Sequence, residues 1–187
     1  HMDLLMMSCR KSQEADADAW GIYVFFDADT RADFSRSDLF IQTRPVPDGV
    51  LVANVLGASA PELAVFGQRG DQGFLAVYPF EGRVPQTPLV RESPLGFVPK
   101  GGTNPIDGAP VGLAALDATG DGVVDIVAYD LYNLALFSAK AWTSSDVLAG
   151  KWTTLTSPET WVAILRVFPV RHDGGEWLAI STQYGRT

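Results

Sequence analysis

The strongest constraint on the fold is a pattern of short apolar runs separated by turn residues. The runs are rich in Val, Ile, Phe, Tyr and Trp, while 18 Gly and 12 Pro punctuate the chain. Runs of this length and composition are typical of β-strands. We therefore predict an all-β protein with strands at residues 21–26, 39–43, 50–55, 62–66, 74–78, 111–116, 124–129, 135–138, 152–155, 161–168 and 177–181.

One connection between the predicted strands is unusually long. Residues 81–110 contain six prolines and show little periodicity in their apolar residues. Proline cannot donate a backbone hydrogen bond and is rare inside sheets. We expect this segment to be a long connection between two similar units.

The two units repeat a pattern of apolar strand, polar loop and second apolar strand. Residues 52–65 align with residues 115–128 at an offset of 63 residues, and a weaker third copy covers residues 166–180. Three pairs of polar or glycine positions coincide at this offset: Asn54 with Asp117, Gly57 with Gly120, and Glu62 with Asp125. The alternative is a chance similarity between two strand–loop–strand segments.

Repeats of this size are typical of β-propeller blades. We predict one propeller-like domain over residues 20–187, with units near 50–80, 111–140 and 161–187. At a spacing of 63 the 187 residues hold about three units, fewer than the four to eight blades of closed propellers. We expect a truncated propeller, a partial propeller completed by another chain, or a smaller open arrangement. A homo-oligomer is the solution we favour.

The most specific motif is an acidic loop over residues 117–125. Aspartates stand at its first, fifth and ninth positions and a threonine at its third. Carboxylates held this close repel one another unless a cation lies between them, and Ca²⁺ takes six to eight oxygen ligands. We predict a calcium site in which the side chains of Asp117, Thr119, Asp121 and Asp125 and the backbone carbonyl of Val123 bind the ion.

Other interpretations of this loop are an EF-hand, a magnesium site and an acidic turn without an ion. An EF-hand needs a Glu at position 12 and flanking helices, but Ala128 stands there, within an apolar run that predicts a strand. Mg²⁺ fits less well because it keeps several of its waters. A solvated acidic turn without an ion remains the alternative.

The segment 112–127, with its loop of Asp117, Thr119, Asp121 and Asp125, resembles an FG-GAP or VCBS-type repeat. In that family an Asp-rich loop joins the first two strands of a propeller blade and holds Ca²⁺. The resemblance implies a β-propeller or part of one, usually in exported or surface proteins, and it does not imply one activity. In the first copy Ala58 stands at the position equivalent to Asp121.

Charge and composition exclude several classes of function. The 14 Lys and Arg against 22 Asp and Glu give a net charge of −8, which argues against binding to duplex nucleic acid and to anionic membranes. No apolar run approaches the roughly 18 residues of a membrane-spanning helix. One Cys and two His exclude an internal disulfide framework and a multi-cysteine zinc site.

The N-terminal residues 1–19 are expected to be a flexible tag or tether. Residues 4–9 resemble the end of a bacterial lipoprotein signal, in which a short apolar run precedes a lipidated Cys. This resemblance implies export to the periplasm or cell surface, with a lipid anchor at Cys9. A floppy apolar start followed by a polar linker is the alternative.

No catalytic constellation is evident in the sequence. The chain has no Gly-x-Ser-x-Gly motif, and nothing in the spacing of Glu62, Glu81 and Glu176 selects a catalytic pair. His172 lies in a turn signature, where a surface histidine is expected. We predict a calcium-stabilised, non-catalytic binding module that recognises a protein or polysaccharide. The alternative is a carbohydrate-active enzyme, or a fragment of one, on a β-propeller.

Overall fold

The computed structural model describes residues 3–10, 19–43, 46–58, 60–69, 72–93, 110–130, 134–140, 147–155 and 162–184. Every ladder between the strands of this part of the chain is antiparallel, and its regular structure is entirely strand. The all-β prediction is therefore confirmed. The same residues contain no helix with the length and hydropathy of a membrane span.

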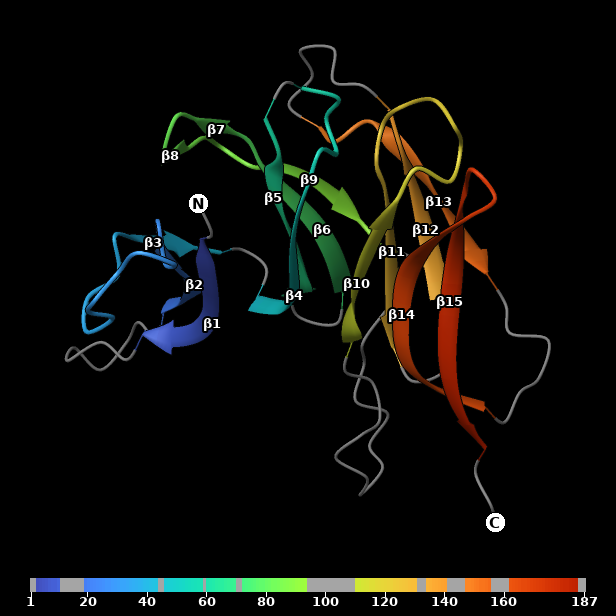
Figure 1. The fold of residues 1–187 in the computed structure, drawn as a ribbon, viewed down its shortest axis with the longest axis horizontal. Coiled ribbons are helices and arrows are strands. Elements are labelled where there is room, and N and C mark those ends of the chain that lie inside the picture. The colour runs from blue at the N-terminus through green and yellow to red at the C-terminus, as the bar shows by residue number, and fades with distance from the viewer. Residues whose placement is uncertain are drawn as a thin grey trace.

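The strands form a series of small antiparallel sheets that follow one another along the chain (Figure 1). The N-terminal sheet contains β1 (Leu4–Arg10), β2 (Ala19–Phe25) and β3 (Leu39–Gln42). The second sheet contains β4 (Val46–Ala53), β5 (Glu62–Arg69), β6 (Gln72–Tyr78) and β9 (Leu89–Glu92), with the small hairpin β7 (Phe80–Glu81) and β8 (Val84–Pro85) beside it in sequence. The third contains β10 (Pro110–Leu116), β11 (Asp125–Asp130), β12 (Leu134–Ala139) and β13 (Gly150–Leu155), and β14 (Val162–His172) pairs with β15 (Gly175–Tyr184).

Each predicted strand overlaps a strand of the structure, but the N-terminal expectation differs from what is seen. Where a flexible tether was expected over residues 1–19, Leu4–Arg10 forms β1 and pairs along its length with β2. Residues 11–18 lie outside the described part of the chain. Met6 and Met7 are exposed while their backbones pair with Tyr23 and Ile22, so backbone pairing rather than an alternating apolar pattern makes this strand.

The predicted long connection also contains structure. β9 lies within residues 81–110 and completes the second sheet by pairing with β6. β9 is a strand because it pairs with β6, which lies earlier in the chain. The local sequence pattern around β9 therefore gives little indication of a strand. Residues 94–109 lie outside the described residues.

The second and third sheets have the same design. In each, strands follow one another in sequence order, and the first strand carries an irregularity in its register with the second. These irregularities fall between Pro47 and Gly49 in β4 and between Pro110 and Gly112 in β10, again 63 residues apart. A β-bulge bends its strand and is a regular feature of sheet architecture rather than a defect. The predicted repeat therefore has a structural counterpart in these two sheets.

Successive sheets pack face to face, and from the second sheet onward their first strands lie side by side. β4 contacts β10, and β10 contacts β14. Three apolar layers lie between the sheets. Alternate residues of a strand point to opposite faces of its sheet, so one strand can contribute to two layers. The layer between the second and third sheets includes Phe66, Leu75, Ile126 and Phe137, all fully buried.

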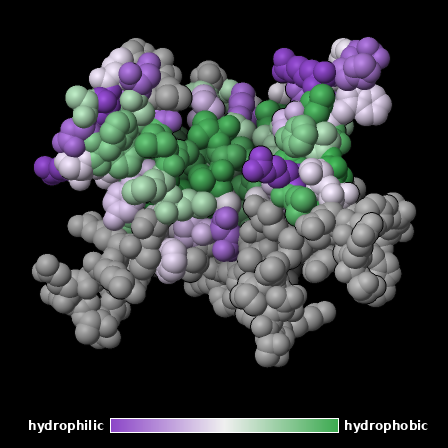
Figure 2. Space-filling view, turned by 60° about the horizontal axis from the view of Figure 1, so that its bottom comes forward, coloured by the Kyte–Doolittle hydropathy of each residue, from purple (hydrophilic) through white to green (hydrophobic). Residues whose placement is uncertain are grey.

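The other two layers join the N-terminal sheet to the second sheet and the β14–β15 hairpin to the third sheet. Ile22 of the N-terminal sheet packs with Val65 of the second, and Val127 of the third sheet packs with Ile164 and Val167 of β14. Figure 2 shows hydrophobic residues reaching across the middle of the described molecule, with hydrophilic residues gathered toward its upper corners. No sheet among the described residues closes on itself.

Candidate functional site

The predicted ion-binding loop connects β10 to β11, in the third sheet. Gly120 and Gly122 both have positive φ angles, 75° and 82°. Residues with a Cβ rarely adopt this left-handed conformation, whereas glycine adopts it without penalty. The two glycines thus let the loop turn back on itself within a few residues.

The carboxylates of the loop are hydrogen-bonded by its own backbone. Asp117 Oδ1 accepts from Gly120 N at 2.7 Å and from Asp121 N at 3.2 Å, and its Oδ2 accepts from Gly122 N at 2.9 Å. Asp121 Oδ1 accepts from Val123 N at 2.9 Å. The loop is therefore wrapped around the Asp117 carboxylate.

Asp125, the ninth residue of the motif, is fully buried at the start of β11. Its Oδ2 accepts from Ala118 N at 2.9 Å and from Thr119 N at 3.2 Å, and its Oδ1 accepts from Ala139 N at 2.9 Å. Burial raises the pKa of this carboxyl, and the backbone hydrogen bonds oppose that rise. Asp125 joins the loop to the end of β12.

These hydrogen bonds change the electrostatic argument for an ion. The sequence predicts that crowded carboxylates need a cation, but backbone N–H groups supply much of the compensating positive charge here. Among the described residues, no group of three or more His, Cys, Asp or Glu side chains is placed to hold a metal. The five predicted ligands share one loop and offer only oxygen donors, which suits a hard cation. The donor chemistry thus fits Ca²⁺, and the described side chains form no acidic cluster around one point.

The first copy of the repeat uses its acidic residue in the same way. Glu62 Oε2 accepts from Val55 N at 2.8 Å and from Leu56 N at 3.2 Å. Asn54, the counterpart of Asp117, differs from it because its Nδ2 donates a hydrogen bond to the carbonyl of Ala58 at 2.8 Å. The loop of the second sheet is thus held without the Asp117-type carboxylate.

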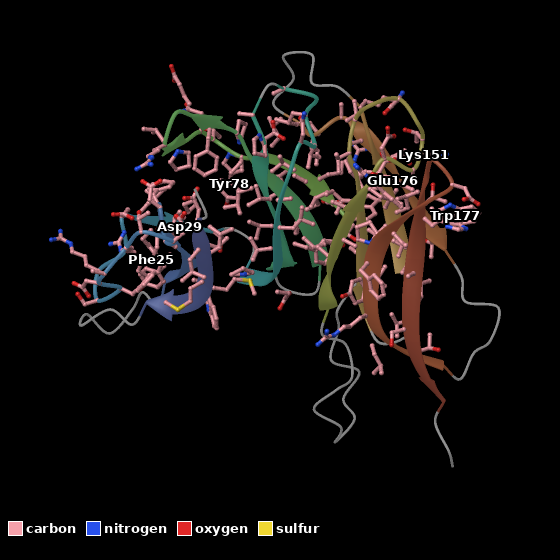
Figure 3. All side chains as sticks on the ribbon, in the orientation of Figure 1. Phe25, Asp29, Tyr78, Lys151, Glu176 and Trp177 are labelled. Atoms are coloured by element: carbon pink, nitrogen blue, oxygen red, sulfur yellow. The ribbon has the colours of Figure 1, made fainter. Side chains whose placement is uncertain are left out.

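A groove lies between the acidic loop and the turn of the β14–β15 hairpin. Its volume is about 650 Å³, and it is lined by Asp117, Ala118, Thr119, Gly120, Arg171, Gly174, Gly175 and Glu176. Glu176 Oε2 accepts from Asp117 N at 2.8 Å, while Glu176 Oε1 lies 3.2 Å from Arg171 Nε. Figure 3 shows Glu176 near the loop end of the sheets. Glu176 therefore joins the hairpin to the loop.

Arg171 and Glu176 were not among the predicted site residues. The sequence feature that could have indicated them is the weak third copy of the repeat, in which Asp173, Gly174 and Gly175 precede Glu176. The turn itself is tight, since both Asp173 and Gly174 have positive φ angles. Its packing against a loop far away in sequence could not be read from the repeat alone.

Two other residues singled out from the sequence lie elsewhere. His172 is exposed in the same turn, and its Nε2 lies 3.2 Å from Asp173 Oδ2, as expected for a surface histidine. Cys9 lies in β1, where its backbone pairs with Trp20. Among the described residues, His172 is not part of the groove lining.

Comparison of the chain with known proteins finds no matching family model, no matching curated protein and no matching solved structure.

Proposed function

We propose that this chain is a calcium-stabilised, non-catalytic binding module of an exported or surface protein. Its sheets are blades of an FG-GAP or VCBS-type propeller, and it recognises a protein or a polysaccharide in the groove beside the acidic loop. The observation that carries the proposal is the conformation of residues 117–125. Asp117 is wrapped by the backbone of a loop that turns at two left-handed glycines.

The serial packing of the sheets supports the propeller part of the proposal. Each large sheet is a four-stranded antiparallel meander, and the first strands of neighbouring sheets lie side by side. Blades of a propeller are four-stranded sheets arranged around a central axis. First strands that contact one another correspond to the innermost strands of such blades.

The loop retains oxygen atoms that an ion can use. A carboxylate has about four acceptor sites; Asp117 uses three and Asp121 one for the hydrogen bonds described. The exposed Thr119 hydroxyl and the Val123 carbonyl would complete the set, with the buried Asp125 as the remaining ligand. Bound Ca²⁺ would neutralise the loop and fix one wall of the groove.

Thermal unfolding with and without EDTA tests the calcium part. An ion present at 100 times its dissociation constant stabilises the folded state by about 2.7 kcal/mol, which for a domain of this size raises Tm by roughly 5–10 °C. We expect Asp121→Asn to abolish this difference. Glu62→Gln is the matched control, because it removes a buried loop carboxylate without removing a proposed ligand. An unchanged Tm on chelation of the unaltered protein would reject the ion.

A carbohydrate-active enzyme is the alternative, since Asp117 and Glu176 both line the groove. Each is already bonded: Asp117 to its own loop, and Glu176 to Asp117 N and Arg171. This favours a binding role over proton transfer. A glycan array combined with a reducing-sugar assay separates the two. Turnover that Glu176→Gln abolishes, with the fold intact, would establish the enzyme instead.

The proposed location rests on separate features. The lipoprotein-like residues 4–9 favour an exported protein. Because a signal of this kind is removed up to the lipidated Cys, a chain lipidated at Cys9 would lack residues 4–8, so the lipid anchor and an intact β1 are alternatives. Mass spectrometry of the protein from the membrane fraction of a bacterial host tests whether Cys9 carries a lipid. Recovery of the unmodified chain from the cytoplasm alone would reject export.

A further inference from the structure

The series of packed sheets ends in two apolar faces, one on the β14–β15 hairpin and one on the N-terminal sheet. The register pairs Val170 with Trp177 and Phe168 with Ala179, which places these four side chains on one side of the hairpin. The opposite side of the hairpin packs on the third sheet through Ile164 and Val167. We call the outward side (Phe168, Val170, Trp177 and Ala179) the C-terminal face.

Three of the four residues of the C-terminal face are large, apolar and exposed. Trp177 is 61% exposed, and Phe168 and Val170 are also exposed. In the sheets inside the series, both faces of the central strands are buried by neighbouring sheets. The hairpin therefore has the composition of an internal sheet, with one neighbour on its inner side.

The N-terminal sheet has a corresponding outward face. The register pairs Met6 with Tyr23 and Tyr23 with Phe40, and Leu4 stands two residues before Met6 on the same side of β1. The rings of Tyr23 and Phe40 contact each other in a tilted arrangement with centroids 4.8 Å apart, while Leu4 and Met6 are exposed, Met6 at 47%. We call these four residues the N-terminal face. Phe25, the register partner of Leu4, lies on the same side and is buried in contact with Phe34 of the β2–β3 connection. The opposite side of the sheet, which includes Ile22, packs on the second sheet.

The two faces lie at opposite ends of the molecule. Figure 3 shows Phe25 and Asp29 of the N-terminal region on one side and Trp177 on the other. A contact between the two faces therefore joins two separate copies of the chain. Each junction inside one copy is likewise a sheet face packed on a sheet face, so such a contact continues the existing series.

Charge favours the same pairing. Arg166 shares the outward side of the hairpin with Trp177, as its register partner Ser181 shows. The connection between β2 and β3, residues 26–38, carries four Asp against two Arg; Asp38 pairs with Arg31 and Asp27 with Arg83, and Asp29 and Asp33 add further acidic charge. Opposite charges around two apolar patches favour contact between these faces over contact of either face with itself.

We propose that the chain associates head to tail, with the C-terminal face of one copy packed on the N-terminal face of a second copy. Such an interface is heterologous, because different surfaces meet, and it closes into a ring when the rotation between copies permits. This proposal depends on neither calcium nor the groove, and it applies to the chain that keeps β1, because the N-terminal face includes Leu4 and Met6. Its failure would leave the proposed function of the acidic loop untouched.

Light scattering of the whole chain, from low to high micromolar concentration, tests the proposal. We expect a mass of at least twice 20.2 kDa at the upper end. Trp177→Lys on the C-terminal face and Met6→Lys on the N-terminal face should each weaken association at least tenfold. Val84→Lys is the matched control, because Val84 is exposed on β8 outside both faces.

Mixing the two face variants separates a head-to-tail contact from other modes. The Trp177→Lys chain keeps an intact N-terminal face, and the Met6→Lys chain keeps an intact C-terminal face. An equimolar mixture should therefore form a dimer that neither variant forms alone. Circular dichroism and Tm check that each variant folds, with Phe168→Glu as a second variant of the C-terminal face. A strict monomer at every concentration, or full association by either face variant alone, would overturn the proposal and leave the faces to a different partner.

Discussion

Glu62 and Asp125 occupy equivalent positions 63 residues apart, and each carboxylate accepts two backbone hydrogen bonds from the loop that precedes it. The donors are residues 55 and 56 in one sheet and residues 118 and 119 in the other, so they too are 63 residues apart. Both acids stand at the first position of the second strand and are buried. The repeat thus conserves a carboxylate that holds the loop to the strand.

The first prediction follows from this pair. Asp125→Asn replaces an acceptor of three backbone N–H groups with an amide that brings its own donors, so a buried N–H loses its partner. An unsatisfied buried donor costs about 1–3 kcal/mol. We expect Asp125→Asn to lower the free energy of unfolding by about 2 kcal/mol, measured by urea denaturation. Glu62→Gln should act in the same direction and less strongly, because two donors meet Glu62.

The control for both variants is Glu92→Gln. Glu92 is an exposed acid on β9 and is expected to change stability by less than about 0.5 kcal/mol. Burial raises the pKa of both Glu62 and Asp125. If Asp125→Asn proved as mild as the control, the carboxylate would not be holding the loop.

The second prediction concerns the loop around Asp117. Asp117→Ala removes the acceptor of the N–H groups of Gly120, Asp121 and Gly122. These amides are then exposed to solvent, so their hydrogen exchange should accelerate at least tenfold. Amides of β5 serve as the internal reference, because that strand pairs on both sides. Equal exchange at residues 120–122 in both proteins would show that the loop keeps its shape without the side chain.

The strands were predictable because they depend on local periodicity. Apolar runs bounded by turn residues located each of the predicted strands, and the repeat correctly made Glu62 the counterpart of Asp125. A further local signal was available in the Pro-x-Gly segments at residues 47–49 and 110–112, where both first strands change register.

Features that depend on distant partners were not predictable. β1 lacks β-branched residues, and its apolar run resembles a signal segment, so only its pairing with β2 defines it as a strand. β9 lies in a proline-rich stretch and exists through pairing with β6. The bond from Asp117 N to Glu176 joins residues 59 positions apart and arises from the packing of the hairpin. The crowding of carboxylates in the sequence likewise gives no indication that backbone N–H groups of the folded loop donate hydrogen bonds to them.

The third prediction is a dependence of stability on pH through Asp48. Burial raises the pKa of Asp48 from 3.8 to about 6, and its Oδ2 has no hydrogen-bond partner among the described residues. The folded state therefore holds this proton more tightly than the unfolded state between pH 3.8 and about 6. Stability contributed by Asp48 must fall as pH rises through this window. Asp48→Asn should match the unaltered protein near pH 4 and exceed its stability at pH 7 by about 1 kcal/mol.

The comparison for Asp48 is Asp33→Asn. The backbone and side-chain hydrogen bonds from Ser35 lower the pKa of this exposed carboxyl, so its contribution to stability has the opposite sign. Loss of Asp33 should therefore reduce stability at neutral pH relative to acid pH. Urea unfolding at a series of pH values measures both. Superimposable pH profiles for Asp48→Asn and the unaltered protein would exclude the role of Asp48.

The last prediction couples Gly112 to Tyr129 across the β10–β11 pair. A Cβ at position 112 would lie 2.7 Å from Tyr129 Oη, closer than carbon and oxygen can approach. Tyr129 is buried, so its ring cannot simply move into solvent, and Gly112→Ala should destabilise the fold by about 1–3 kcal/mol. Removing the hydroxyl with Tyr129→Phe should restore about 1 kcal/mol in the double variant, a coupling that a double-mutant cycle in urea measures. Gly175→Ala is the matched control, because its new Cβ meets Trp177 Nε1 at an ordinary 3.5 Å. Strictly additive effects would mean that the backbone, rather than the tyrosine hydroxyl, requires glycine at position 112.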